Sequence, residues 1–225
     1  MDYKVIDTND GSKTIYLPAM DEQYHSVNGA ITESEHVFLK NGYLYHQSTT
    51  PKVFEVGFGT GLNCLLTALK AEELKRSTTY YSIEKYPLKK QITEQLNYGL
   101  SISSAARELF EKIHSCKWNE TVSLTEYFQL RKIKADLLTD NLRTAGIFNI
   151  IYFDAFAPDK QPEMWNTDVF EKIYSLTTAK GVFVTYSAKG IVRRQLAACG
   201  FDMEKLPGPP GKFQMLRGIK TDLNA

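Results

Sequence analysis

The stretch EVGFGTGLN, Glu55 to Asn63, has the residue types that hold a charged ligand against the backbone. Its three glycines separate a β-forming run from a helical one, and glycine, which lacks a Cβ, lets a ligand lie directly on the chain. The first amides of the following helix favour an anion. We expect a nucleotide-type site here, held by Glu55, Gly57, Gly59, Thr60, Gly61 and Asn63.

The spacing of these glycines separates two classes of cofactor. A dinucleotide fingerprint, G-x-G-x-x-G, would need glycine at position 62, where this chain has Leu62. The third glycine comes one residue earlier instead. A G-x-G-x-G loop is common in enzymes that bind S-adenosylmethionine, which has one carboxylate to hold rather than a pyrophosphate. The loop predicts S-adenosylmethionine, with a purely structural turn as the alternative.

Two carboxylates stand where further strands of the same sheet are expected to end. Glu84 follows the run TYYSI, at the distance where an acidic residue accepts hydrogen bonds from both ribose hydroxyls. Asp136 ends YFQLRKIKAD and is expected to accept from the adenine amino group. Each could instead be a solvated loop carboxylate. Three strand ends that meet in one crevice favour the cofactor site.

Asp154, in the stretch DAFAPDKQPEMW, is the candidate catalytic residue because it follows a buried strand beside that crevice. Methyltransferases that act on amines often hold the target nitrogen with a motif of a polar residue, prolines and an aromatic residue at this place, and DAFAP is similar in offering a carboxylate, a rigid turn and an aromatic ring. An alkyl amine has a pKa near 10.4, so freeing its lone pair at pH 7 costs about 4.6 kcal/mol. An ionised carboxylate alone would raise that pKa further. We therefore expect Asp154 to bind and aim an amine and to stabilise charge moving onto nitrogen. Whether it also accepts a proton stays open.

The same stretch supplies a rigid turn and two rings. Phe156 and Trp165 are expected to stack on a planar substrate group, with Pro158 between them in the turn. The alternative makes Asp154 a helix cap and places both aromatic side chains in the core.

An open α/β sheet would bring these residues together. From Pro51 onward β-forming and helical segments alternate, which argues for a mostly parallel sheet with helices on both faces. We expect seven strands in a Rossmann-like domain, 51–225, preceded by a small β-rich extension, 1–50. The expected strands are 13–18 and 36–42 in the extension, then 52–58, 79–85, 127–136, 147–156, 180–188 and two within 201–220; the expected helices begin near 62, 88, 162 and 190.

Several stretches together resemble the methyltransferase domain of the bacterial bifunctional MnmC family of tRNA-modifying proteins. They are YHSVNGAITESEHVFL, EVGFGTGLN, SIEKYPL, DAFAPDKQPEMW, SAKGIVRRQLAACGF and PGPPGKFQML. The resemblance implies a class I S-adenosylmethionine-dependent methyltransferase fold. It also implies methylation of the aminomethyl nitrogen of 5-aminomethyl-(2-thio)uridine at the tRNA wobble position.

The resemblance also implies roles for individual residues. Gly57, Gly59, Gly61 and Glu84 take the cofactor role, and Asp154 takes the catalytic one. Tyr24, Ser26 and Glu33 fall on an amino-terminal motif that closes over the active site.

Two departures from the family pattern limit what is expected. The bifunctional relatives carry a flavin-dependent oxidase domain, whereas this chain ends at Ala225, so we expect only the methylation step, on an aminomethyl uridine supplied by other uridine-modifying enzymes. Relatives usually show Lys-Arg-Glu-Met-Leu near the end, but Phe213 and Gln214 stand here between Lys212 and Met215. This difference affects the expected substrate contacts and not the fold.

The overall composition does not indicate a nucleic-acid partner, so such a partner has to be inferred from local groups of residues. With a formal net charge of +1, no global field favours a polyanion. Basic residues are instead concentrated after position 180, and a patch there could hold phosphates beside a splayed anticodon base; a solvated basic surface is the equal alternative. The residues expected to form this patch are Lys189, Arg193, Arg194, Lys212, Arg217 and Lys220.

The remaining features predict a cytoplasmic protein. Cys64, Cys116 and Cys199 lack the spacing of a disulfide framework or a metal site. The first residues lack the apolar core of a secretory signal, and no apolar run reaches membrane-spanning length. We therefore expect no membrane association.

Two other functions stay open on the sequence. The chain could methylate a small-molecule or protein amine, or it could bind S-adenosylmethionine without catalysis. Intact Glu84 and Asp154 argue against the second, and salt dependence separates RNA from small-amine binding. A nicotinamide dehydrogenase is disfavoured by Leu62.

Overall fold

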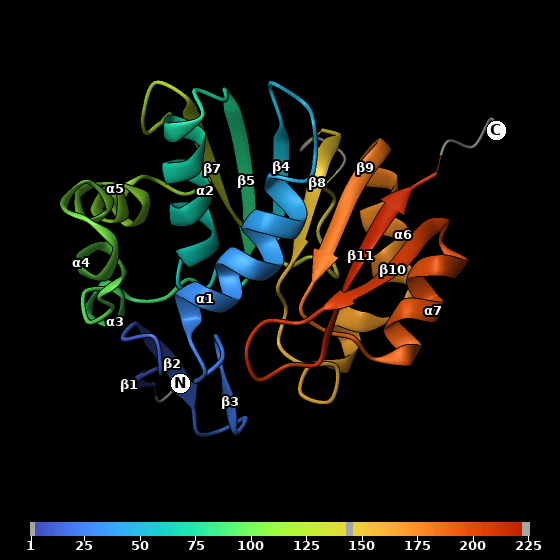
Figure 1. Cartoon of the computed structure of the whole chain (residues 1–225), viewed down its shortest axis with the longest axis horizontal. Helices are drawn as coiled ribbons and strands as arrows, with labels where there is room; N and C mark the ends of the chain where they lie inside the picture. Colours follow the sequence, from blue (N-terminus) through green and yellow to red (C-terminus); the bar gives the residue numbers. More distant parts are fainter. Residues whose placement is uncertain (1–2, 143–145, 222–225) are drawn as a thin grey trace.

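A sheet of eight strands forms the centre of the molecule, in the order β10-β11-β9-β8-β4-β5-β7-β6 (Figure 1). The computed structural model describes residues 3–142 and 146–221. The strands of this sheet are β4 (Lys52–Val56), β5 (Thr78–Glu84), β6 (Thr121–Ser123), β7 (Phe128–Lys134), β8 (Phe148–Phe153), β9 (Thr177–Thr185), β10 (Phe201–Pro207) and β11 (Gln214–Lys220).

Five strands of the sheet are parallel, and this sets where a site can form. Strands β9, β8, β4, β5 and β7 pair in parallel, while β10, β11 and β6 join by antiparallel pairs. The carboxyl ends of the parallel strands therefore lie at one edge of the sheet, where ligands bind in open α/β folds.

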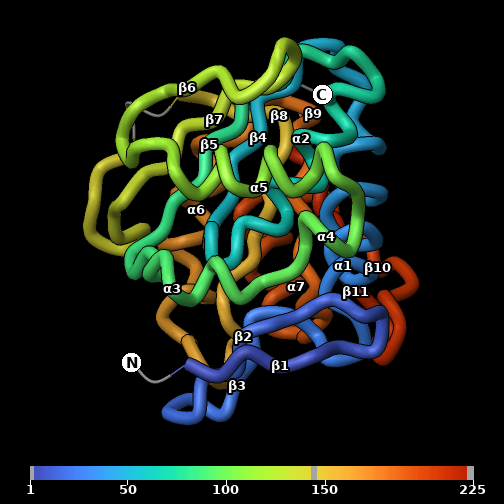
Figure 2. Tube along the Cα trace, turned by 90° about the vertical axis from the view of Figure 1, so that its left-hand side faces the viewer, coloured from blue at the N-terminus to red at the C-terminus, as the bar shows by residue number. Residues whose placement is uncertain are grey.

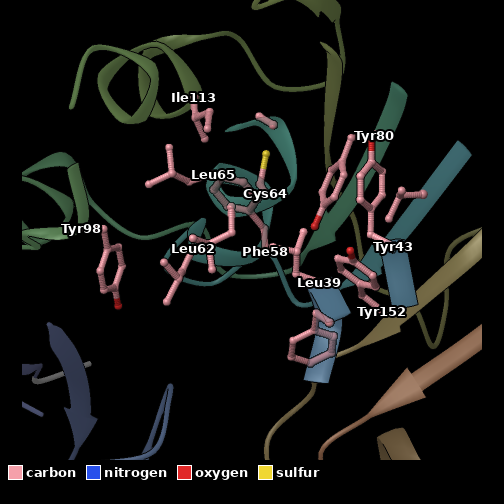
Figure 3. Packing of buried hydrophobic residues seen from close by; sticks show 14 of the residues in the cluster. Leu39, Tyr43, Phe58, Leu62, Cys64, Leu65, Tyr80, Tyr98, Ile113 and Tyr152 are labelled. Atoms are coloured by element: carbon pink, nitrogen blue, oxygen red, sulfur yellow. The ribbon is translucent and has the colours of Figure 1, made fainter. Parts of the chain in front are cut away.

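Two hydrophobic cores cover the two faces of the sheet, because successive strand residues point to opposite sides. On β8, Ile150 belongs to one core and Ile151 to the other. Strands buried on both faces read as continuous apolar runs, which explains why FNIIYF is apolar almost throughout. Figure 3 shows part of the first core, where Tyr80 on the sheet packs against Tyr152 and lies near Cys64.

Helices form a layer on each face. The helices are α1 (Ala30–Ser34), the π-type helix η1 (Glu35–Tyr43), α2 (Leu62–Glu73), α3 (Lys90–Thr93), α4 (Tyr98–Ile102), α5 (Ser104–Ser115), the 3₁₀ helix η3 (Pro162–Trp165), α6 (Thr167–Leu176) and α7 (Gly190–Ala198). Side chains of η1, α2 and α5 join the first core, and those of α6 and α7 join the second. Figure 2 shows α5 in front of α2 and the sheet.

The amino-terminal segment forms a second, three-stranded antiparallel sheet of β1 (Lys4–Asp7), β2 (Lys13–Leu17) and β3 (Glu22–Gln23). Figure 1 shows this sheet below the edge where the parallel strands end. Its position makes it one wall of any cavity at that edge. No helix within the described ranges is long and apolar enough to span a membrane.

The structure corrects three expectations. Residues 36–42, expected as a strand, are helical in η1, because a short apolar run does not distinguish a strand from a buried helix. The main sheet has eight strands within the described ranges rather than seven, since the short β6 adds to its edge. The helix expected from 88 is broken into α3 and α4, and α5 was not expected at all.

Candidate active site

A cavity of about 550 Å³ lies at the carboxyl ends of the parallel strands. Its walls come from the loops after β4, β5, β7 and β8 and from residues of the amino-terminal segment between β2 and α1. This volume lies within the range of about 300–1,000 Å³ that is usual for small-ligand sites. The ends of four strands and the small sheet therefore enclose one site.

The glycine loop lies against this cavity in a conformation that needs glycine. Gly57 has φ 88° and Gly59 has φ 48°, both in the region that favours glycine. A Cβ at Gly57 would lie 2.5 Å from the backbone oxygen of Asp154, so the loops after β4 and β8 meet here. Because α2 starts without a side-chain cap among the described residues, its first amides are available to a ligand carboxylate.

Both strand-end carboxylates line the cavity. Glu84 accepts hydrogen bonds from the backbone amides of Gly59 (3.1 Å) and Tyr86 (2.8 Å), which fix its position beside the glycine loop. Asp136 forms an ion pair with Lys85 at 2.8 Å and accepts from the Leu138 amide. The hydrogen bond from Lys85 lowers the pKa of Asp136, so this carboxylate is ionised.

Asp154 lies at the end of β8 and faces the same cavity. Its carboxylate accepts a hydrogen bond from Asn63 Nδ2 at 2.8 Å. Burial, followed by the negative charge of Glu33, raises the pKa of Asp154 to about 7, while Asn63 and Lys212 act in the opposite direction. A carboxylate with this pKa can exchange a proton near neutral pH.

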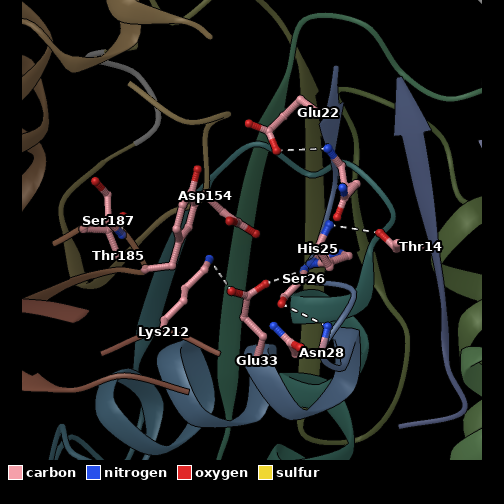
Figure 4. A network of polar contacts seen from close by, with 12 residues as sticks. Thr14, Glu22, His25, Ser26, Asn28, Glu33, Asp154, Thr185, Ser187 and Lys212 are labelled. Atoms are coloured by element: carbon pink, nitrogen blue, oxygen red, sulfur yellow. Dashed lines mark hydrogen bonds and ion pairs between the residues drawn. The ribbon is translucent and has the colours of Figure 1, made fainter. Parts of the chain in front are cut away.

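Glu33, from α1, is a further acidic residue of the cavity wall (Figure 4). It is only 6% exposed, accepts the Ser26 amide at 2.8 Å and pairs with Lys212 at 2.5 Å. Lys212 also lies over the Tyr186 ring, 4.0 Å from its centroid. Ser26, Glu33 and Lys212, all expected as substrate residues, thus come together although they are distant in sequence.

Aromatic side chains form another part of the wall. Tyr24 and Phe156 line the cavity with their rings edge to face at 5.1 Å. Trp165, expected to stack on substrate, is 3% exposed and packs against Phe153 and Phe170. Its indole N–H donates to the Phe156 oxygen at 2.7 Å, so Trp165 is a core residue that supports the turn. The expectation for Trp165 was wrong.

Other expected residues lie outside the cavity wall. Glu55 is completely buried, accepts a hydrogen bond from Ser82 Oγ, and has its pKa raised to about 8 by burial. It therefore holds strands together rather than contacting a ligand. Lys189 pairs with Asp159 at the surface. The expected site residues absent from the described cavity wall are Glu55, Gly61, Pro158, Trp165, Lys189, Arg193 and Arg194.

Two histidines missed by the sequence reasoning hold the glycine loop. Thr60 is bonded through Oγ1 to His25 Nε2 (2.7 Å) and through its backbone oxygen to His114 Nε2 (3.1 Å). Burial lowers the pKa of each histidine to about 4, so both are neutral at pH 7. The only sequence signal for His25 was its place between Tyr24 and Ser26.

The cavity fits S-adenosylmethionine on this geometry. The glycine loop and the start of α2 suit its carboxylate, Glu84 suits the ribose hydroxyls, and Asp136 lies near the apolar Ile83 and Leu137, which suit adenine. Asp154 lies beyond the loop, where a nucleophile would meet the methyl group. Within the described part of the chain, no group of His, Cys, Asp and Glu side chains could hold a metal ion.

The chain is similar to known proteins along most of its length. MnmC of Leptospira interrogans (strain Fiocruz L1-130), named as a bifunctional protein of tRNA 5-methylaminomethyl-2-thiouridine biosynthesis, is 32% identical over 217 residues, which cover 90% of this chain and 33% of the relative. MnmC of Actinobacillus pleuropneumoniae (serotype 5b) is 32% identical over 222 residues, covering 89% and 32%. The chain thus spans about a third of the length of these relatives.

Solved structures agree with the architecture. The crystal structure of MnmC2 from Aquifex aeolicus has a TM-score of 0.80 and 25% identity, and covers 96% of this chain and 70% of that one. Spermidine synthase from Thermotoga maritima, with a TM-score of 0.54, 13% identity and coverage of 100% and 73%, shares the fold alone.

The chain also matches the model of a protein family. The model described as S-adenosyl-L-methionine-dependent methyltransferase matches residues 102–221, more than half of the chain. The matched part carries Asp136 and Asp154, and the glycine loop lies against it. The chain belongs to the family of S-adenosyl-L-methionine-dependent methyltransferases.

Proposed function

We propose that this chain methylates the aminomethyl nitrogen of 5-aminomethyl-(2-thio)uridine at the tRNA wobble position, giving the 5-methylaminomethyl form. One observation carries the proposal. The Asp154 carboxylate, half-buried and hydrogen-bonded to Asn63, faces a cavity that also has a cofactor loop and an aromatic wall. The names of the MnmC relatives and of Aquifex MnmC2 support this choice of substrate.

Bound S-adenosylmethionine would supply an electrophilic methyl group on a positively charged sulfur. The protein has to present an amine that is uncharged at the moment of attack. Asp154 would first bind the ammonium form through its ionised carboxylate. Because burial and the nearby Glu33 charge bring the pKa of Asp154 to about 7, it can also accept the amine proton, which leaves the amine free to attack and Asp154 neutral. When Asp154 passes that proton on to solvent, its carboxylate is again charged and stabilises the positive nitrogen of the methylated product.

The aromatic and polar walls would position the base. Phe156 offers a ring for stacking with the uracil plane, and Tyr24 braces it edge to face. On the polar wall, the ion pair of Lys212 with Glu33 and the hydrogen bond from the Ser26 amide would hold the side chains in place, so that the amine meets a preformed site.

The proposal also implies partners and a location. The tRNA anticodon loop would contact the cavity mouth, and the exposed Lys189, Arg193 and Arg194 would hold its phosphates. The aminomethyl group has to be made by other uridine-modifying enzymes before this step. The reaction takes place where tRNA is modified, in the cytoplasm.

Nucleoside analysis of tRNA from cells that lack the protein tests this proposal. We expect 5-aminomethyl-(2-thio)uridine to accumulate in place of its methylated form, and the wild-type gene, but not one encoding Asp154→Asn, to restore the methylated form. Unchanged wobble nucleosides in the mutant cells would contradict the proposal.

A further inference from the structure

The loop between β10 and β11 carries the most exposed large apolar side chain in the described ranges. Phe213 is 91% exposed, against 70% for Leu100, the next in this group. A single exposed apolar residue is common on protein surfaces and needs no explanation by itself. The place of Phe213 beside the cavity and the hydrogen-bonded conformation of its loop point to a function for this side chain.

The loop that carries Phe213 has a fixed conformation. The Gly208 amide donates to the Phe213 oxygen at 3.1 Å, and the Lys212 amide donates to the Pro209 oxygen at 2.9 Å. His36 Nε2 is bonded to the Pro207 oxygen at 2.8 Å, which ties the loop to η1. The prolines at 209 and 210 restrict the backbone further. Phe213 is therefore presented from a rigid support.

The same loop forms part of the active-site wall. Lys212 turns inward, lines the cavity and pairs with Glu33, whereas the next side chain, Phe213, points into solvent. Adjacent Cα atoms lie about 3.8 Å apart. The backbone that bears the exposed ring thus lies one residue from the cavity wall, at its mouth.

We propose that Phe213 is a stacking platform for an unpaired nucleobase of the RNA, next to the nucleotide whose amine enters the cavity. This inference rests on the proposed function. A nucleotide that enters the cavity leaves its stack, and the neighbouring base loses a stacking partner. An exposed aromatic ring replaces that partner whatever the identity of the base, because every base has a π-face. Phe213 therefore adds affinity for the loop without reading its sequence.

Binding and kinetics with a short anticodon stem-loop RNA, containing the aminomethyl uridine, test this inference. F213A should raise both Kd and KM for this RNA about tenfold, equivalent to about 1.4 kcal/mol, while kcat changes by less than twofold. The affinity for S-adenosylmethionine should be that of the wild type. L100A is the matched control, since it removes an exposed apolar side chain on α4, away from β10 and β11 (Figure 1), and should match the wild type throughout.

A second variant supplies a readout that does not depend on activity. F213W keeps a stacking ring, so the RNA should bind with wild-type affinity and quench the fluorescence of the new indole. Wild-type RNA affinity in F213A, or unquenched fluorescence in F213W, would overturn the inference. So would a change in sedimentation of F213A without RNA, which would identify the loop as a contact between copies of the chain. If the wild type methylates no RNA, the proposed function fails too; normal RNA methylation with normal F213A affinity contradicts this inference alone.

Discussion

At the scale of single residues, the proposed chemistry depends most on Asp154. Its carboxylate lines the cavity and accepts a hydrogen bond from Asn63 beside the glycine loop, and burial raises its pKa to about 7. Asp154→Asn keeps the size of the side chain and removes its charge. We expect kcat to fall by at least about 100-fold, the usual contribution of a positioned acid or base, with the Kd for S-adenosylmethionine changed less than about threefold. Equal losses in kcat and in cofactor affinity, measured by single-turnover kinetics and calorimetry, would place Asp154 in the cofactor site instead.

The raised pKa of Asp154 predicts a feature of the pH profile. Its ordinary pKa is 3.8, and burial together with the charge of Glu33 raises it to about 7, so below pH 7 the group is protonated and cannot pair with an ammonium ion. As the pH falls below about 7, kcat/KM should therefore decrease by a further factor of about ten for each pH unit, which appears as a break in a plot of log kcat/KM against pH. The same plot for Asp154→Asn should lack this break, and a break at the same pH in the variant would assign it to another group.

At the scale of elements, the bond between His25 and Thr60 connects the amino-terminal segment to the glycine loop. Thr60→Val removes the hydroxyl and leaves a buried histidine without its partner, at a cost of about 1–3 kcal/mol. We expect thermal unfolding several degrees lower and cofactor binding weakened about fivefold or more. Thr60→Ser keeps the hydroxyl and serves as the matched control. Equal cofactor affinities in the two variants would show that this bond does not hold the loop in its binding conformation.

Strand β4 carries a buried acid whose effect is on stability. Burial raises the pKa of Glu55 from 4.5 to about 8, so the folded chain keeps a proton that the unfolded chain releases above about pH 4.5. This contribution to stability is complete below pH 4.5 and is lost as the pH rises to about 8. Glu55→Gln should reduce the loss of unfolding free energy between pH 5 and 8, measured by urea denaturation. Parallel pH curves for the two proteins would contradict a buried, neutral Glu55.

Some of the strands and helices that form the site can be predicted from the sequence, and others cannot. The strands that carry Glu84, Asp136 and Asp154 were recognisable as apolar or alternating runs, and parallel strands bring their carboxyl ends to one edge. Helix α5 was missed although its signal is present, since Ser103 caps it and Ala106, Leu109, Phe110 and Ile113 follow a helical period. Contacts such as Glu33 with Lys212, 179 residues apart, depend on tertiary packing and cannot be derived from spacing.

At the scale of the whole molecule, the proposed reaction needs a methyl donor and a nucleophile in one cavity. The loops after the parallel strands line the proposed cofactor side of this cavity, and the small amino-terminal sheet and the β10–β11 loop line the proposed substrate side. With a net charge of only +1, binding of a large polyanion has to come from local contacts around the cavity mouth. RNA binding should therefore weaken steeply with added salt, whereas binding of a small amine should barely change.

Transfer of a labelled methyl group to tRNA is the most direct test of the proposed reaction. The protein is incubated with methyl-labelled S-adenosylmethionine and tRNA that contains the aminomethyl uridine, and the tRNA is then digested to nucleosides. We expect label in 5-methylaminomethyl-(2-thio)uridine from the wobble position, formed at least about 100-fold more slowly when Asp154→Asn replaces the wild type. Label found only in protein, in free small amines or in other nucleosides would contradict the proposed reaction.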